Sequence, residues 1–417
     1  MKGKRFLALV LTVLMLSVLV VGCQGETPTT TPGGAAPPSS AAPSSAPPSS
    51  AAPSQSVPPP PPEKEFIKNF SLYGEGSDNV RVQFEQQVEL FNATNEHGYV
   101  ATLQWMTSGT GTISMHDRMI GAFNAGESGT DFDVFEFGGD NIPNYMSRGG
   151  PGMFHDLDYS LIPNAQYLQF EANEYPEKFI PYRGTTVVLA YNSAVISNPP
   201  KTADELYQWI KDNPGRFAYN PPSTGGAGSA FVRTVLYNDL PPEALLSIDE
   251  KWMDEWEPGW DKLRELHPYL YKSGGKVVYP NKNQGSIDLL AAGEVDMIPA
   301  WADMIISQRR SGTLPDSIQI VQIEPAFTGS TVVLCVPTMG TNYEGAHAFI
   351  NYMLSPEAQN IALDSMAAIP VIDFNLLDKD LLPLISSLKI NEFRLSTIGI
   401  LGNHINEIFD EEIAPLG

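Results

Sequence analysis

The sequence predicts a protein of the α/β class, built as two lobes that each hold a mostly parallel sheet flanked by helices. Short apolar runs of roughly four to eight residues alternate along the chain with segments whose apolar residues recur at helical spacing. Several of these runs are apolar on both faces, which is typical of strands buried in parallel sheets. Residues 63–417 are also long enough for two lobes, at about 150 residues per domain.

The apolar runs give the expected strands. A short strand precedes Tyr73, and further strands are predicted at 99–105, 132–137, 185–191, 216–219, 276–279, 295–301, 318–323 and 331–336.

Helices are predicted between these strands from apolar spacing and capping residues. Phe84, Val88 and Phe91 share one helical face, and Met115, Met119 and Phe123 share another. Further helices are expected at 141–146, from an Asp249 cap to 266, at 286–293, at 342–354 and at 356–366.

The N-terminus reads as an export signal, residues 1–22. Basic residues at positions 2, 4 and 5 precede the apolar run Phe6–Val21, which is short for a membrane span of roughly 20 residues. The run ends in Val20-Val21-Gly22-Cys23, which resembles the lipobox of bacterial lipoproteins, so Cys23 is the expected lipidation site. An uncleaved anchor helix is the alternative. Both place the remaining chain outside the cytoplasm, on the outer face of the cell membrane.

Residues 23–62 are predicted to be a tether. From Glu26 to Pro62 the chain consists mainly of Pro, Ser, Ala, Thr and Gly, and such a stretch buries too little apolar surface to offset its ordering entropy. In polyproline geometry it would reach on the order of 100 Å.

Composition excludes several classes of function. Removing the three basic residues of the signal takes the net charge from −23 to −26, and such a charge argues against binding nucleic acid or anionic lipid. The chain has two cysteines, so neither a disulfide framework nor a zinc ribbon is expected. Cys335 lies in an apolar run, where a small buried side chain is the expected role.

Catalytic motifs are absent from the sequence. The six histidines form no H-E-x-x-H pair, and there is no G-x-S-x-G elbow, Walker A loop or G-x-G-x-x-G turn. We therefore predict no enzyme activity, no cofactor and no metal site. An anchored extracellular hydrolase with a carboxylate pair remains the alternative, because Asp and Glu are plentiful.

Small and polar residues follow several of the predicted strands. Ligands of open α/β sheets bind at the carboxyl ends of strands, where helix N-termini converge. The strongest such segment is Asn220–Phe231, whose glycines are expected to expose the first N–H groups of a helix. The candidate ligand contacts are Tyr73, Glu75, Ser108, Thr110, Gly138, Asp140, Asn141, Ser223, Gly225, Gly226, Trp301, Asp303 and Ser330. Ordinary loops, N-caps and, for Trp301, core packing are the competing interpretations.

The order of these segments resembles the extracellular solute-binding proteins of ABC importers, of the type II periplasmic-binding-protein class. The branch is similar to the thiamine, polyamine and iron binders, and the similarity runs from about Phe66 to the C-terminus. The motifs that carry it are Asn213–Pro222, Gly228–Val232, Asp288–Met297 and Leu354–Gln359, with hinge crossings at Arg183–Asn192 and Phe327–Val333.

The resemblance implies lobe 1 at about 66–189 and 326–417, and lobe 2 at about 190–325. A small solute would lie between the lobes, and hinge closure would be recognised by a membrane permease with its ATPase. The protein is expected to be a monomer. A sensory or adhesion module on the same fold is an alternative to transport.

The solute class stays open at this point. Iron binders of this class show a neighbouring tyrosine pair, and this sequence has no Tyr-Tyr, which puts ferric iron in doubt. Glu75, Asp140 and Asp303, with Tyr73, Tyr145 and Trp301, would suit an organic cation such as a polyamine or thiamine-like compound. The Gly-rich helix start would instead suit an anion or a sugar.

Overall fold

The computed structural model describes residues 66–107, 113–169, 174–390 and 394–416. The chain divides into two units, residues 1–63 and 64–417, and the description below concerns the second. The predicted signal peptide, tether and Cys23 lie outside the described residues, as do Ser108 and Thr110.

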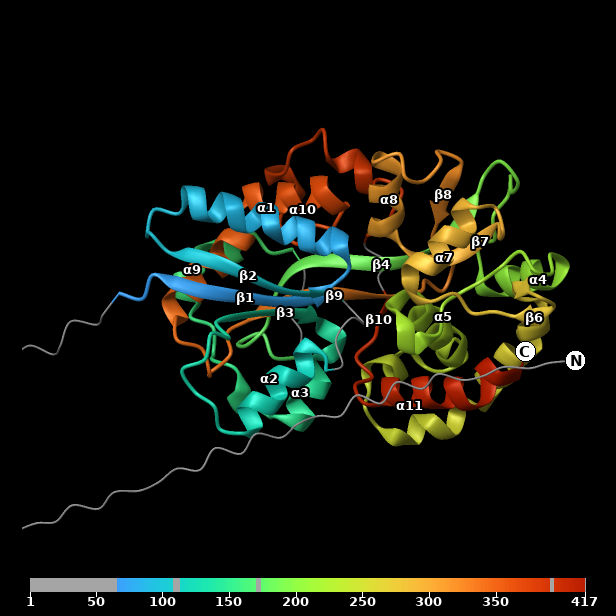
Figure 1. Cartoon of the computed structure of the whole chain (residues 1–417), viewed down its shortest axis with the longest axis horizontal. Coiled ribbons are helices and arrows are strands. Elements are labelled where there is room, and N and C mark those ends of the chain that lie inside the picture. The colour runs from blue at the N-terminus through green and yellow to red at the C-terminus, as the bar shows by residue number, and fades with distance from the viewer. Residues whose placement is uncertain (1–65, 108–112, 170–173, 391–393, 417) are drawn as a thin grey trace, which may run out of the picture. The chain divides into compact units, whose positions relative to one another are not determined.

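One curled sheet runs through both lobes of the fold (Figure 1). Its strands are β1 (Asn69–Gly76), β2 (Val100–Thr107), β3 (Val134–Gly138), β4 (Ile180–Asn192), β7 (Met297–Trp301), β8 (Ile318–Val321), β9 (Thr328–Cys335) and β10 (Arg394–Leu395). The order is β2-β1-β3-β9-β4-β7, with β8 on β4 and β10 on β9. β1 is parallel to β2 and β3, and β10 is parallel to β9, whereas β4 is antiparallel to each of its partners. A separate hairpin joins β5 (Lys272–Ser273) to β6 (Lys276–Val277).

The two lobes are joined by β4. Its first half, Ile180–Thr186, pairs with β9, and its second half, Val187–Asn192, pairs with β7 and β8. The 13-residue strand is therefore shared by both lobes, which confirms the predicted two-lobe α/β fold and the hinge crossing at Arg183–Asn192.

Helices cover the sheet in each lobe (Figure 1). They are α1 (Asp78–Thr94), α2 (Met115–Asn124), α3 (Ile142–Arg148), α4 (Ala203–Asp212), α5 (Gly226–Tyr237), α6 (Glu257–Leu266), α7 (Lys282–Ala291), α8 (Ala302–Arg310), α9 (Tyr343–Met353), α10 (Pro356–Met366) and α11 (Leu401–Ile408). In α1, the predicted apolar face of Phe84, Val88 and Phe91 is buried in the core of lobe 1.

Cys335 has the role that the sequence predicts. It is fully buried in β9, in an apolar cluster with Phe135 and Val333, and burial raises the pKa of its thiol well above the usual value. The side chain acts as a small core hydrophobe.

Two predictions about the fold are wrong. Residues 216–219 do not form a strand. They pair with the sheet at one position only, through a bridge between Phe217 and Met297. The C-terminal residues belong to lobe 2 and not to lobe 1. Ile398, Leu401 and Phe409 pack in the same core cluster as Phe231, and Arg394 of β10 donates to the Asn238 side chain and the Tyr237 carbonyl of lobe 2.

His347 makes the stability depend on pH. The side chain is buried; its Nδ1–H donates to the Tyr343 carbonyl at 2.8 Å, and its Nε2 accepts from the Asp158 N–H at 3.0 Å. The ring is therefore neutral, and burial lowers its pKa below 6.5. Because the unfolded state then binds a proton more readily, stability is full above about pH 6.5 and falls at lower pH.

We expect a His347→Gln variant to flatten this dependence. Urea unfolding between pH 7.5 and 5.5 should show a slope smaller by up to about 1.4 kcal/mol per pH unit than in the unmodified protein. Partly buried His116 also has a pKa lowered by desolvation, and it contributes a slope that the variant keeps. Equal slopes in both proteins would show that His347 does not titrate in this range.

Candidate functional site

A cavity of about 1070 Å³ lies between the lobes, at the place where β4 and β9 pass from one to the other. Lobe 1 contributes the ends of β1 and β3 and the start of α1. Lobe 2 contributes the starts of α5, α7 and α8, together with residues of α11. A cavity of this size is large enough for a small organic molecule.

Most of the sequence-predicted contacts line this cavity. They are Glu75, Gly138, Asp140, Asn141, Ser223, Gly225, Gly226, Trp301, Asp303 and Ser330.

Two of the predicted aromatic contacts do not line the cavity. Side chains two residues apart on a strand share a face, so Tyr73 lies on the same side of β1 as Glu75 but further from the end of the strand. It is buried in the core of lobe 1, where its hydroxyl donates to Asp131 Oδ2 at 2.8 Å. Tyr145 is fully buried as well and bonds to His116 Nδ1. The prediction that these rings face a solute is therefore wrong.

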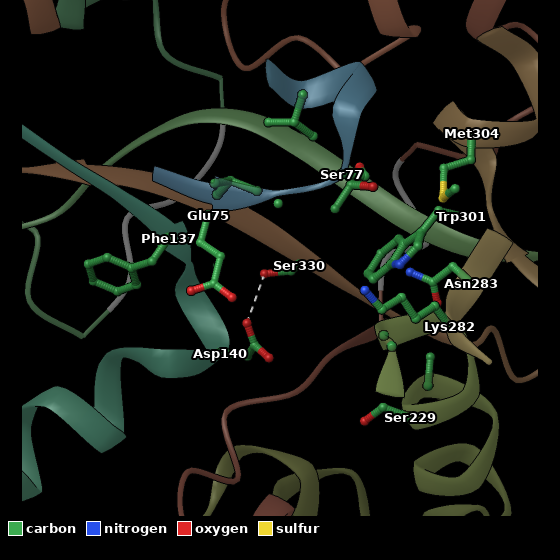
Figure 2. Close-up of a pocket in the computed structure, with 18 of the residues that line it drawn as sticks. Glu75, Ser77, Phe137, Asp140, Ser229, Lys282, Asn283, Trp301, Met304 and Ser330 are labelled. Atoms are coloured by element: carbon green, nitrogen blue, oxygen red, sulfur yellow. Dashed lines mark hydrogen bonds between the residues drawn. The ribbon is translucent and has the colours of Figure 1, made fainter. Parts of the chain in front are cut away.

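Glu75 forms the acidic end of the cavity on lobe 1. Its Oε2 accepts the Met115 N–H at 2.9 Å, so the start of α2 fixes the half-buried carboxylate in place. Among the described residues, no Lys or Arg nitrogen lies within 4 Å of it. Figure 2 shows Glu75 and Asp140 pointing into the same space.

Asp140 lies between the lobes. Its Oδ1 accepts the Ser330 hydroxyl at 3.4 Å, and its Oδ2 lies 3.6 Å from Nη1 of Arg233 on α5. Because Asp140 follows β3 of lobe 1 and Arg233 belongs to lobe 2, this ion pair crosses the cleft.

Asp303 makes a second contact across the cleft. Its buried carboxylate accepts from Asn79 Nδ2 of α1 at 2.9 Å and from Thr185 Oγ1 of β4 at 3.2 Å. Burial raises its pKa. Asp303 thus ties the start of α8 to lobe 1 and to the hinge strand.

A buried ion pair lies beneath the cavity. Arg183 Nη2 of β4 is 3.3 Å from Glu136 Oε1 of β3, and the Tyr182 hydroxyl donates to the same oxygen at 3.0 Å. Arg183 Nε donates in turn to the Tyr182 oxygen at 2.8 Å. Burial raises the pKa of Glu136 although the Arg183 charge lowers it. The network fixes the hinge strand to lobe 1.

The start of α5 is less open than the sequence predicts. The Ala227 N–H donates to Asn283 Oδ1 at 3.1 Å, and the Gly228 N–H donates to Asn220 Oδ1 at 3.2 Å. Side-chain amides therefore already satisfy two of the N–H groups that the Gly-rich segment was expected to expose. Since the Asn283 oxygen is engaged, its amide nitrogen is the atom turned toward the cavity (Figure 2).

Trp301 forms an apolar wall on lobe 2. Its indole lies against Gly226, where an added Cβ would come within 2.5 Å of Trp301 Cζ2. Beside it, Lys282 adopts a left-handed backbone with φ 63°, which is uncommon for a lysine. Figure 2 shows the Lys282 amine pointing into the cavity toward Glu75 and Asp140.

Metal binding and membrane insertion find no support in the described ranges. These ranges contain no cluster of three His, Cys, Asp or Glu side chains that could hold a metal ion. They also contain no helix long and apolar enough to cross a membrane. His116 lines the cavity, but burial lowers its pKa, so it is a neutral group there.

Comparison with known families gives the cavity a context. The family model described as "Bacterial extracellular solute-binding protein" matches residues 86–379, which is more than half of the chain. The protein belongs to this family. This confirms the resemblance seen in the sequence, and the extracellular location agrees with the family description.

Individual relatives of this solute-binding protein are distant. Protein YnjB of Escherichia coli (strain K12) is 29% identical over 187 residues, which are 43% of this chain and 46% of YnjB. The aligned region thus spans about half of that curated relative.

Solved structures show the same fold at low identity. An ABC transporter structure from Clostridium perfringens ATCC 13124 has a TM-score of 0.57 at 17% identity and covers 82% of this chain and 97% of its own. The Tp0655 (TpPotD) lipoprotein of Treponema pallidum has a TM-score of 0.60 at 17% identity and covers 82% and 99%.

Sequence reasoning missed several cavity residues of the solute-binding protein. They are Ser77, Asp78, Asn79, His116, Glu136, Arg183, Ser229, Arg233, Lys282, Asn283, Met304, Ser307, Gln308 and the α11 residues Gly402, Asn403 and Asn406, among others. One signal was available for part of this set. Gly226, Ser229 and Arg233 are spaced three and four residues apart, so they share the face of α5 that the Gly-rich loop presents.

Proposed function

We propose that the protein is the substrate-binding component of an ABC importer. It captures a small solute between its two lobes, closes over it and presents the closed form to a membrane permease. The observation that carries this proposal is a large cavity lined from both lobes and crossed by the hinge strands β4 and β9. The fold shared with an ABC transporter protein of Clostridium perfringens supports it.

Closure needs contacts that form between the lobes, and the described residues supply two of them at the cavity. The Asn79–Asp303 hydrogen bond and the Asp140–Arg233 ion pair both connect lobe 1 to lobe 2 at the cavity. Such contacts stabilise a closed arrangement, and they cost little to open because each joins only one pair of side chains. Capture by hinge motion requires no catalytic group, so we propose a binding role without turnover.

The proposed solute carries a positively charged organic group. Glu75 offers a half-buried carboxylate without a cationic partner in the described structure, and Asp140 lies beside it. Trp301 offers an indole face against which an organic cation or its carbon chain can pack. A sugar or an anion is the alternative class.

The proposed cellular setting follows from the N-terminal sequence. Cys23 would carry lipid, and the Pro- and Ser-rich residues 23–62 would let the binding unit work clear of the membrane surface. Tp0655, which is a lipoprotein, shares the fold and supports this arrangement. We propose that the protein acts as a monomer at the outer face of the cell membrane.

A thermal-shift screen tests the binding role. The protein would be melted with polyamines, thiamine-like cations, amino acids, sugars, oxyanions and metal ions. A solute at 100 times its dissociation constant adds about 2.7 kcal/mol to the stability of the folded state, so one chemical class should raise the melting temperature clearly. Stabilisation by none of these classes would count against a small-solute receptor, and formation of product on long incubation would show an enzyme instead.

Replacing Trp301 tests whether its side chain binds the solute or only packs in the core. Trp301→Ala should weaken solute binding by about 1–3 kcal/mol, the range for loss of an aromatic anchor, while the melting temperature without solute changes little. Trp252→Ala is the matched control, because Trp252 is partly buried in lobe 2 but is not among the residues that line the cavity. Equal affinities for both variants, measured by calorimetry, would show that Trp301 serves only core packing.

A further inference from the structure

Arg233 brings a buried hydrogen-bond donor without an acceptor to the wall of the cavity. The residue belongs to α5 of lobe 2, and its side chain is 19% exposed. Its Nε is buried and has no hydrogen-bond partner among the described residues. Its Nη1 lies 3.6 Å from Asp140 Oδ2, which allows charge attraction but is too long for a hydrogen bond. Because a guanidinium has five N–H groups and unpaired buried donors cost free energy, Arg233 is suited to bind an oxygen of the solute.

The Arg233 guanidinium is held between α11 and lobe 1. Its Nη2 lies close to Gly402, where an added Cβ would come within 3.1 Å of it, and a glycine offers no side-chain acceptor. On the lobe 1 side, Asp140 uses its other oxygen, Oδ1, to accept from the Ser330 hydroxyl at 3.4 Å. These neighbours therefore position the guanidinium at the cavity but do not satisfy its donors.

The charge of the cavity favours a neutral oxygen over an anionic one at Arg233. Among the described residues that line the cavity, five are Asp or Glu and three are Lys or Arg. Asp140 already offsets the charge of Arg233. A carboxylate or phosphate on the solute would be repelled by the surplus of negative charge, whereas a hydroxyl would not. Ser229, four residues before Arg233 on the same face of α5, adds a second hydroxyl-binding group to this wall (Figure 2).

The oxygen that Arg233 would bind lies near the acidic end of the cavity. An oxygen that accepts from Nη1 at about 2.9 Å lies within about 6.5 Å of Asp140 Oδ2. Asp140 in turn points into the same space as Glu75 (Figure 2). A hydroxyl on a carbon close to an amine can therefore reach Arg233 while the ammonium group stays on the carboxylates.

On the basis of the proposed function, which places a positive group at Glu75 and Asp140, we infer that the solute is a hydroxylated amine, such as an amino sugar. Its ammonium group contacts the two carboxylates, and a hydroxyl close to the amine accepts from Arg233. Its carbon skeleton packs against the indole of Trp301. Arg233 is then the residue that separates hydroxylated amines from plain ones.

Calorimetry with matched pairs of amines tests this inference. Glucosamine would be compared with cyclohexylamine, and serinol with isopropylamine, so that the charge is the same within a pair and the hydroxyl groups differ. In at least one pair the hydroxylated amine should bind about tenfold or more tightly, because a plain amine leaves the buried donor unpaired. Glucose, which lacks the ammonium group, should bind about tenfold or more weakly than glucosamine.

Plain amines that bind as tightly as their hydroxylated partners in both pairs would overturn the inference and leave a receptor for organic cations intact. Failure of all four amines, while another organic cation stabilises the protein, would overturn it as well. Glucose that binds as tightly as glucosamine would contradict the ammonium contact. Absence of binding by every class in the thermal-shift screen would remove both the inference and the receptor role.

Variants of Arg233 assign the hydroxyl contact. In the best pair, Arg233→Met should lose the preference for the hydroxylated amine but bind the plain amine at least as tightly as before, because Asp140 is freed from its cationic partner. Arg233→Lys returns one donor group and should regain part of the preference. Arg264→Met, on α6 and outside the cavity, is the control and should change neither affinity. A preference that survives in Arg233→Met, or equal losses for both amines, would contradict the role of Arg233.

Discussion

A Gly228→Ala variant should lose about 3 kcal/mol of its free energy of unfolding, although it adds a single methyl group. A Cβ at position 228 would lie 1.8 Å from the Asn220 backbone oxygen, and a carbonyl of the main chain cannot turn aside as a side chain can. The Gly228 N–H is also bonded to Asn220 Oδ1, so displacement of the loop breaks that contact as well. Urea unfolding measures the loss.

Gly121→Ala is the matched control for this substitution. Gly121 lies inside α2 with no atom within 4 Å of an added Cβ, so alanine should stabilise the protein by about 0.5–1 kcal/mol through its higher helix propensity. The two variants make the same chemical change in two helices, and they should differ in sign. Equal effects would show that the close approach of α5 to Asn220 is not a constraint in solution. Any solute binding that survives in Gly228→Ala should be weaker, because the displaced loop forms part of the cavity wall.

Arg183→Met should cost about 3–5 kcal/mol, because it leaves Glu136 buried without its cationic partner. The loss should be smaller at pH 5 than at pH 8. Burial already raises the pKa of Glu136, and without Arg183 the pKa rises further, so the folded state keeps a proton on Glu136 at low pH. The penalty for an ionised buried carboxylate is thus absent below the ordinary pKa and develops as the pH rises.

Two further variants check that reading of the ion pair. The double variant Glu136→Leu with Arg183→Met should recover most of the lost stability, since apolar replacement of both members of a buried pair is often close to neutral. Arg81→Met, which breaks an exposed pair with Glu85 on α1, should leave the free energy of unfolding almost unchanged. A double variant as unstable as Arg183→Met alone would show that the arginine contributes through packing and not through its charge.

The elements that sequence predicts well are those decided by local pattern. The apolar face of α1 at Phe84, Val88 and Phe91, the helix predicted at 342–354 and the apolar run of β9 all depend on neighbouring residues, and the structure confirms them. The small and polar loops after β3 and before α5 line the cavity because the ends of strands and the starts of helices converge there.

The features that sequence did not reveal depend on contacts between distant segments. Nothing local in α11 indicates that Leu401 packs beside Phe231 of lobe 2 and not in lobe 1. Glu136 and Arg183 are 47 residues apart in the sequence, so the residues beside each one do not indicate that the two form an ion pair. Tyr73 is an error of position along the strand: the ring shares a face of β1 with Glu75, but it lies two residues further from the strand end, in a core cluster with Met115.

A crystal structure of the protein grown with its most stabilising compound tests the central claim most directly. We expect electron density for the compound between the lobes, with contacts to Glu75, Trp301 and Arg233 and with the Asn79–Asp303 bond retained. Density for the compound at another surface, with the space between the lobes left to water, would contradict the claim that this cavity is the solute-binding site.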